Sequence, residues 1–142
     1  MCEYIQKLGG SDILCKKIVK LQSLGQELCP EKIEDYFLSE YKKENGRVLE
    51  NFWFVSPKYV LESKKIYQEV NNIDIMCIDE YIGRYEINYN NYDMKEANEN
   101  SILSISCWTG NSIMIMNASG FNCDKLWSIF ERYIKPNLYK AD

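Results

Sequence analysis

Two strand-like segments in the last third of the chain give the clearest structural signal in this sequence. Residues 102–108 place Leu103, Ile105 and Cys107 on one face, and residues 112–116 form the second segment. Only Thr109-Gly110-Asn111 separates the two. A short connection rich in Gly and Asn between alternating segments is the strongest local sign of a β-hairpin. Because only one face of the first segment is strongly apolar, we expect an antiparallel sheet that covers a core on one side. That apolar face consists of Leu103, Ile105 and Cys107.

Further strand-like segments lie between residues 47 and 89, and each is rich in β-branched and aromatic residues. Pro57 ends the first of them. The stretch that follows is ambiguous, because residues 57–67 fit either a strand or a helix. We expect an antiparallel sheet within residues 47–118, interrupted by a polar loop at residues 90–100. The strand-like segments are 47–56, 59–61, 73–78 and 82–89.

The N-terminal part of the chain has a helical period instead. A helix is predicted over residues 11–26, and Gly25 marks its expected end. Pro30 suits the first position of a second helix, which Asn45-Gly46 would end. Because the connection between the two is short, we expect a helical hairpin over residues 1–46.

A third helix is predicted near the end of the sequence, over residues 119–138. It would begin after Gly120, with Asn122 as its cap, and Pro136 would close it. Its apolar side chains recur at helical spacing and should face the sheet. They are Leu126, Trp127, Phe130, Tyr133 and Ile134.

These elements together indicate an α+β fold. A helical hairpin at 1–46 precedes an antiparallel sheet at 47–118, and an amphipathic helix at 119–138 caps the sheet. No alternation of strand and helix suggests a parallel sheet. A length of 142 residues is typical of one domain, so we expect a single domain over residues 1–142.

An ordered series of patterns extends from Phe52 to Leu138. An apolar strand, an acidic step, another strand, a hairpin with Gly at its tip and a closing helix follow one another. The segments are Trp53-Phe54-Val55, Tyr59-Val60-Leu61, Ile75-Met76-Cys77-Ile78-Asp79-Glu80-Tyr81-Ile82, residues 101–116 and Leu126-Trp127-Ser128-Ile129-Phe130. In this order they resemble the pleckstrin-homology-like (PH-like) domains of small bacterial proteins.

The resemblance implies a bent antiparallel sheet or partly open barrel, plugged at one end by Trp127 and Phe130 of the last helix. It also implies an adaptor or regulatory role. Eukaryotic relatives bind phosphoinositides through Lys and Arg in the loop between their first two strands. The equivalent stretch here, Ser56-Pro57-Lys58, offers one Lys, so we do not expect lipid-headgroup binding.

The residue inventory argues against most chemistry. The chain has no His, which removes Ser-His-Asp and Cys-His mechanisms. Its six cysteines form no C-x-x-C pair, and it has no glycine-rich nucleotide motif, so we expect no metal and no cofactor. Asp79-Glu80 is interpreted as a turn acid that bonds local backbone and pairs with Arg84. An enzyme would need Asp79, Glu80 or Glu86 to meet a polar partner in a pocket. We therefore predict no catalytic residues and no enzymatic activity.

Charge and hydropathy limit the partners. The net charge is −4, and Lys and Arg form no dense cluster, so we expect no nucleic-acid partner. No stretch approaches the ~20 apolar residues of a membrane span, and the first ten residues do not form a secretion signal. We therefore expect a cytoplasmic protein without membrane insertion, whose cysteines are free thiols.

One cluster of residues has the composition of a recognition surface. Tyr offers a large contact area at a small entropic cost, and Asn adds adaptable hydrogen bonds. The competing interpretation is that Tyr85 and Tyr89 complete the core face of their strand. The candidate partner-binding residues are Tyr85, Tyr89, Asn90, Asn91 and Tyr92.

The sequence therefore favours a non-enzymatic, protein-binding adaptor module. The alternative is a small acidic immunity or inhibitor protein that neutralises a toxin or an enzyme. That alternative is based on the small size, the pI of about 5.0 and the expected cytoplasmic location.

Overall fold

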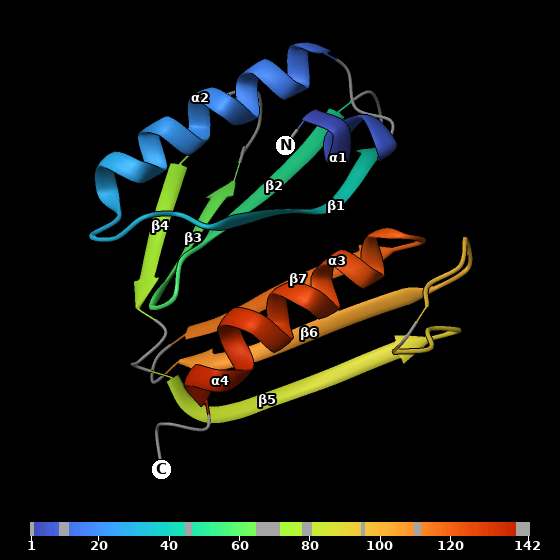
Figure 1. Ribbon diagram of the computed structural model, residues 1–142. Coiled ribbons are helices and arrows are strands. Elements are labelled where there is room, and N and C mark those ends of the chain that lie inside the picture. The colour runs from blue at the N-terminus through green and yellow to red at the C-terminus, as the bar shows by residue number, and fades with distance from the viewer. Residues whose placement is uncertain are drawn as a thin grey trace. The chain divides into compact units, whose positions relative to one another are not determined.

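The computed structural model describes residues 2–8, 12–44, 47–64, 72–77, 81–94, 96–109 and 112–138 (Figure 1). The fold is α+β, as predicted. The chain divides into two compact units, unit 1 at Met1–Met76 and unit 2 at Cys77–Asp142. The sequence predicts one domain over residues 1–142 and does not predict this division into two units. In the described part of the chain the strands form two open sheets, and neither closes into a barrel.

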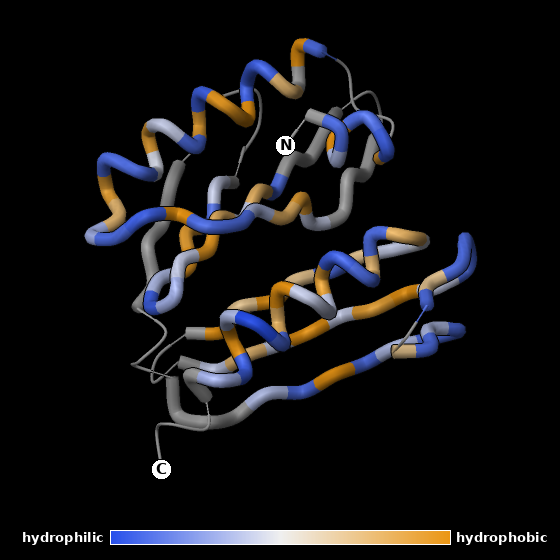
Figure 2. Tube along the Cα trace, viewed as in Figure 1, coloured by the Kyte–Doolittle hydropathy of each residue, from blue (hydrophilic) through white to orange (hydrophobic). Residues whose placement is uncertain are grey.

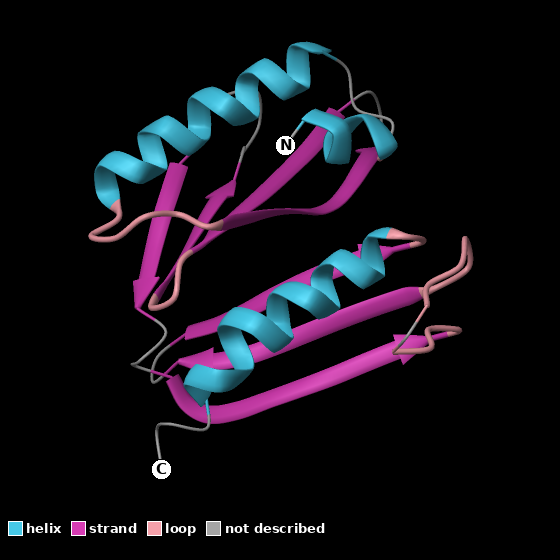
Figure 3. Ribbon diagram, in the orientation of Figure 1, coloured by secondary structure: helices cyan, strands magenta, loops and turns pink. Residues whose placement is uncertain are grey.

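Unit 1 contains two helices and a four-stranded sheet with the order β1-β2-β3-β4 (Figure 3). β1 pairs antiparallel with β2, and β2 pairs antiparallel with β3. Its elements are α1 (Cys2–Lys7), α2 (Asp12–Leu28), β1 (Asp35–Glu44), β2 (Arg47–Val55), β3 (Tyr59–Lys64) and β4 (Asn72–Cys77).

The predicted helical hairpin over residues 1–46 is wrong in its second half. Residues 35–44 form β1 instead of a helix. Phe37 lies opposite Trp53, and Leu38 lies opposite Phe52, so consecutive β1 residues bury aromatic contacts on opposite faces of the sheet. The apolar residues of this segment have helical spacing, but pairing with β2 outweighs that local preference. Burial on both faces of the sheet stabilises the pairing.

Gly25 is also used differently from the prediction, because α2 continues past it to Leu28. A Cβ atom at Gly25 would lie 3.3 Å from Cδ2 of Leu61 and 3.6 Å from Cδ1 of Ile33. Glycine therefore allows α2 to pack closely on the sheet rather than ending the helix. The core beneath α2 consists of Ile5, Cys15, Ile18, Leu21, Cys29, Ile33, Leu38, Phe52, Phe54 and Leu61.

The turn between β2 and β3 is built around one carboxylate. Oε1 of Glu31 accepts hydrogen bonds from Oγ of Ser56 (2.7 Å) and from the backbone N–H of Lys58 (2.6 Å). The extended chain resumes after this turn, so Tyr59–Lys64 is a strand and not the competing helix. The remainder of the ambiguous stretch, residues 65–67, lies outside the described residues.

Unit 2 is a three-stranded antiparallel sheet, with the order β5-β6-β7, covered by the C-terminal helix (Figure 1). The predicted hairpin is confirmed, with Thr109 opposite Ser112. The elements are β5 (Tyr81–Asn90), β6 (Ile102–Thr109), β7 (Ser112–Ser119), α3 (Asn122–Ile129), the π-helical turn η2 (Phe130–Ile134) and α4 (Lys135–Leu138).

The core of unit 2 lies between that helix and one face of its sheet. The predicted apolar face of the hairpin is buried, and the intervening polar positions of β6 are more exposed. Figure 2 shows hydrophobic positions along β6, β7 and α3. The buried residues are Leu103, Ile105, Cys107, Met114, Met116, Ala118, Leu126, Ile129, Phe130, Tyr133 and Ile134.

Three details of the predicted C-terminal helix differ. Asn122 is the first helical residue, and the residue before it, Phe121, makes no side-chain capping bond. Pro136 lies within α4 and does not close it, and the wider turn η2 comes immediately before. Trp127 is only half-buried, whereas Phe130 is buried. In the described part of the chain, none of the helices has the length and apolarity needed to cross a membrane.

Candidate binding surface

The loop between β5 and β6, residues 91–101, is held to the first turn of α3 by Asp124. Oδ1 of Asp124 accepts a hydrogen bond from the Tyr92 hydroxyl at 3.3 Å, and Oδ2 accepts one from the Ala97 N–H at 3.3 Å. A carboxylate is also favourable at this end of a helix, where the unpaired backbone N–H groups carry partial positive charge. Asp124 therefore stabilises both the loop and the start of α3.

Ser101 closes the same loop from within. Its Oγ donates to the Asn91 carbonyl at 2.9 Å and accepts from the Asn98 N–H at 3.0 Å. Its carbonyl accepts from the Gly120 N–H at 2.8 Å. Because Ser101 is buried, these bonds are shielded from competing water. The polar segment predicted at 90–100 is thus confirmed as a loop from residue 91 onward, and it has its own network of hydrogen bonds.

Tyr92 belongs to this internal network and not to the surface. Its side chain is 4% exposed. Burial raises the pKa of Tyr92 far above its ordinary value of 10.0, and the nearby Asp124 carboxylate raises that pKa further. Asn91 has φ of 54°, a left-handed conformation that ends the alternation of β5 and turns the next residue inward. Tyr92 therefore does not present its ring to a partner, which corrects its selection as a contact residue.

The other four predicted residues separate into buried and exposed. Tyr85 is half-buried, and its ring lies 5.2 Å from the ring of Phe130, so it completes the core face as the competing interpretation expected. Tyr89 lies on the same face near the end of β5 and is 59% exposed. Asn90 and Asn91 are exposed beside it.

Two exposed apolar residues at the same end of unit 2 were missed. Ile102 begins β6, lies opposite both Asn90 and Ser119, and is 53% exposed. Phe121 is 72% exposed in the turn that leads into α3. Figure 3 shows that this turn and the β5–β6 loop lie at the same end of the sheet. The available signal was the large apolar residue directly after Gly120 and just before the predicted helix cap, Asn122.

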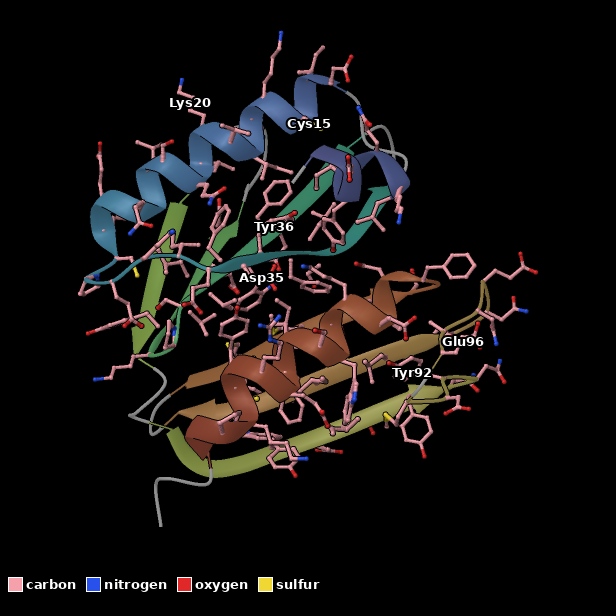
Figure 4. The ribbon with its side chains drawn as sticks, viewed as in Figure 1. Cys15, Lys20, Asp35, Tyr36, Tyr92 and Glu96 are labelled. Carbon is pink, nitrogen blue, oxygen red and sulfur yellow. The ribbon has the colours of Figure 1, made fainter. Side chains whose placement is uncertain are left out.

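We call Tyr89, Asn90, Asn91, Ile102 and Phe121 the loop-end surface. None of the five is charged, and the neighbouring loop carries three exposed carboxylates and a single lysine. Figure 4 shows Tyr92 and Glu96 at this end of unit 2. The loop-end surface is therefore uncharged, and we call the three carboxylates of the adjoining loop its acidic border. The border carboxylates are Asp93, Glu96 and Glu99.

The described residues outside this surface offer little reactive chemistry. Burial raises the pKa of the Cys107 thiol to about 12, and burial beside Asp124 raises that of Cys123 to about 11, so both are unreactive thiols at neutral pH. Glu86 is exposed, and its carboxylate accepts a hydrogen bond from the Asn88 amide at 3.5 Å. Asp79-Glu80 lies outside the described residues. In the part that is described, no three Cys, Asp or Glu residues form a group that could hold a metal.

The comparisons with known proteins add no family to this description. Compared with protein families, curated proteins and solved structures, the chain gives no significant match. The resemblance to PH-like domains remains an expectation from sequence pattern.

Proposed function

We propose that this protein is a non-enzymatic, protein-binding module and that its loop-end surface makes the contact. The observation that carries the proposal is that Tyr89, Ile102 and Phe121 are each more than half exposed at one end of the unit 2 sheet. Tyr89 lies on the face that α3 covers, Ile102 lies on the opposite face, and Phe121 lies in the turn before α3. Clustered exposed apolar side chains on a soluble domain mark interaction sites. Aromatic residues are also enriched in the energetically important centres of such sites.

The anchoring of the loop supports the same function. Asp124 and Ser101 hold the loop through hydrogen bonds to the Tyr92 hydroxyl, the Ala97 amide and backbone groups. A loop already ordered in the free protein loses little conformational entropy on binding, so more of the contact energy appears as affinity. The loop-end surface thus has the preorganisation that a recognition surface needs.

The charges around the surface indicate the chemistry of the partner. Because Asp93, Glu96 and Glu99 border an uncharged centre, the complementary surface is a protein patch with an apolar centre and a basic border. The same acidic border favours the second candidate, an acidic inhibitor that covers a basic site on a toxin or an enzyme. Both candidates use the loop-end surface.

The described residues give no support to lipid-headgroup binding at the turn between β2 and β3. The Glu31 carboxylate already accepts the backbone N–H of Lys58 and the hydroxyl of Ser56. A phosphate brought to this turn would meet a carboxylate and an N–H donor that is already paired. The electrostatics of the turn therefore oppose an anionic ligand.

The test is affinity capture from native lysate with matched variants, followed by calorimetry with each purified partner. Ile102→Lys places a positive charge in the loop-end surface. Ile115→Lys, the control, makes the same change at a similarly exposed residue (45%) on β7. We expect the wild type and Ile115→Lys to bind a partner with a basic border that Ile102→Lys does not bind. Equal binding by all three would contradict the proposal. A toxin or enzyme as partner, inhibited on binding, would identify the second candidate.

A further inference from the structure

Among the residues that the structure describes, strand β7 is an edge of the unit 2 sheet and pairs with β6 on one side only. The Gly120 N–H donates a hydrogen bond to the Ser101 carbonyl at 2.8 Å, and this pair continues the β6–β7 register. The bond therefore shows which residues of β7 direct their backbone groups toward β6 and which direct them away. In an antiparallel ladder every second residue bonds the neighbour and the residues between bond outward. The backbone N–H and C=O groups of Ile113 and Ile115 are therefore directed away from β6.

The two edges of this sheet differ in how they are protected against pairing with another strand. Edge strands are usually blunted by charged side chains, proline or bulges. The β5 edge carries the exposed Glu86, and its register with β6 shifts between Tyr81 and Arg84. The β7 edge, Ser112–Ser119, is eight residues long and contains no charged residue, no proline and no register shift. Of the two edge strands of this sheet, β7 is therefore the one that can pair with a further strand.

Apolar side chains next to this edge are also exposed. Ile113 and Ile115 lie on the sheet face opposite the buried Met114 and Met116, and are 49% and 45% exposed. Trp108, opposite Ile113 on β6, is half-buried on the same face. A strand added beside β7 would therefore satisfy backbone groups and cover apolar side chains together.

We infer that β7 pairs antiparallel with β7 of a second copy of this protein, about a two-fold axis, to give a continuous six-stranded sheet. A second copy fits because an uncharged strand meets no like charge when it pairs with itself. Self-complementarity is what a two-fold interface requires. Outward-bonding residues must face one another, and we place the axis at Met114, which meets this condition. Ile113 then lies opposite Ile115 of the second copy, and Ile115 lies opposite its Ile113. This pairing does not use the loop-end surface.

The association is tested by sedimentation velocity of the full chain, in reducing buffer, from about 10 µM to about 1 mM. We expect a concentration-dependent monomer–dimer equilibrium. Ile115→Lys places two lysines close together across the axis and should raise the dissociation constant more than about tenfold, because like charges across an interface repel. Ile102→Lys, on the same face but on the central strand, should leave it unchanged. A chain that stays monomeric at the highest concentration overturns the inference, as does an equal effect of both substitutions.

Amide hydrogen exchange distinguishes edge pairing from contact through another surface. The amides of Ile113 and Ile115 should become protected as the protein is concentrated, whereas the amide of Met116, bonded to β6, should be protected throughout. Dimerisation without new protection at Ile113 and Ile115 would refute the strand pairing. The two proposals can be separated with Ile102→Lys. This variant should lose partner capture, which tests the proposed function, and should still dimerise, which tests the strand pairing.

Discussion

The buried thiol of Cys107 makes a quantitative prediction about stability in alkaline solution. Burial raises its pKa from 9.0 to about 12 in the folded protein, while in the unfolded chain the thiol ionises at its ordinary pKa. Between these two pH values the unfolded state releases a proton that the folded state retains. The stability is therefore intact below pH 9 and is lost as the pH rises toward 12. One such group changes the free energy of unfolding by about 1.4 kcal/mol per pH unit.

The variant Cys107→Ala isolates this contribution. It leaves a small cavity and should cost about 1–2 kcal/mol at pH 7, less than a Leu→Ala truncation. The wild type loses stability above pH 9 because its Cys107 thiol ionises only in the unfolded chain, and the variant has no such thiol. The difference in stability between the two proteins should therefore vanish near pH 10. Urea unfolding in reducing buffer at half-unit steps from pH 7 to 10.5 measures both curves. Met114→Ala, directly opposite on β7 and also buried, is the control whose cost should not change with pH. If the wild-type and Cys107→Ala curves stayed parallel, the linkage argument would be refuted.

Three further predictions concern the packing of each unit and the anchoring of the loop. Phe130→Ala should cost about 3–5 kcal/mol in urea unfolding, and Trp127→Ala, whose ring is half-buried, about half of that; a larger cost at Trp127 would contradict the placement of the two rings. Gly25→Val should lower the stability by about 1–3 kcal/mol, because α2 packs too closely on the sheet for a larger side chain; a neutral result in thermal unfolding would disprove that close contact. Asp124→Ala removes two 3.3 Å hydrogen bonds and should cost about 1–2 kcal/mol, with faster proteolysis within residues 91–101; unchanged proteolysis would show that Asp124 does not hold the loop.

Local patterns predicted the parts of the fold that depend on near neighbours in sequence. The β6–β7 hairpin was predictable because its turn chemistry and its alternation agree over one continuous stretch. The strand at 35–44 was not, because its apolar residues fit a helix until β2 is placed beside it. Gly25 and Pro136 were interpreted as helix ends. In the fold, Gly25 allows α2 to pack closely on the sheet, and Pro136 lies in α4 just after the wider turn η2.

The sequence indicated the residue types of the candidate surface, Tyr and Asn, but not which residues are exposed there. Tyr89, Asn90 and Asn91 are exposed, while Tyr92 is buried because the left-handed conformation of Asn91 ends the alternation of the strand. That backbone reversal has no sequence signal beyond the tolerance of Asn for positive φ. Phe121 became recognisable only when the turn after β7 was seen at the same end of the sheet as the β5–β6 loop.

The position of Asp124 has a consequence for how binding and stability are coupled. Because this carboxylate belongs to α3 but bonds to Tyr92 and Ala97, the loop is more firmly ordered while the start of the helix is docked on its sheet. A ligand that engages the ordered loop must then raise the free energy required to undock α3, by an amount set by its concentration relative to its dissociation constant. By the reciprocity of linked equilibria, any change that loosens the helix weakens the ligand's affinity equally, even where it touches no contact residue.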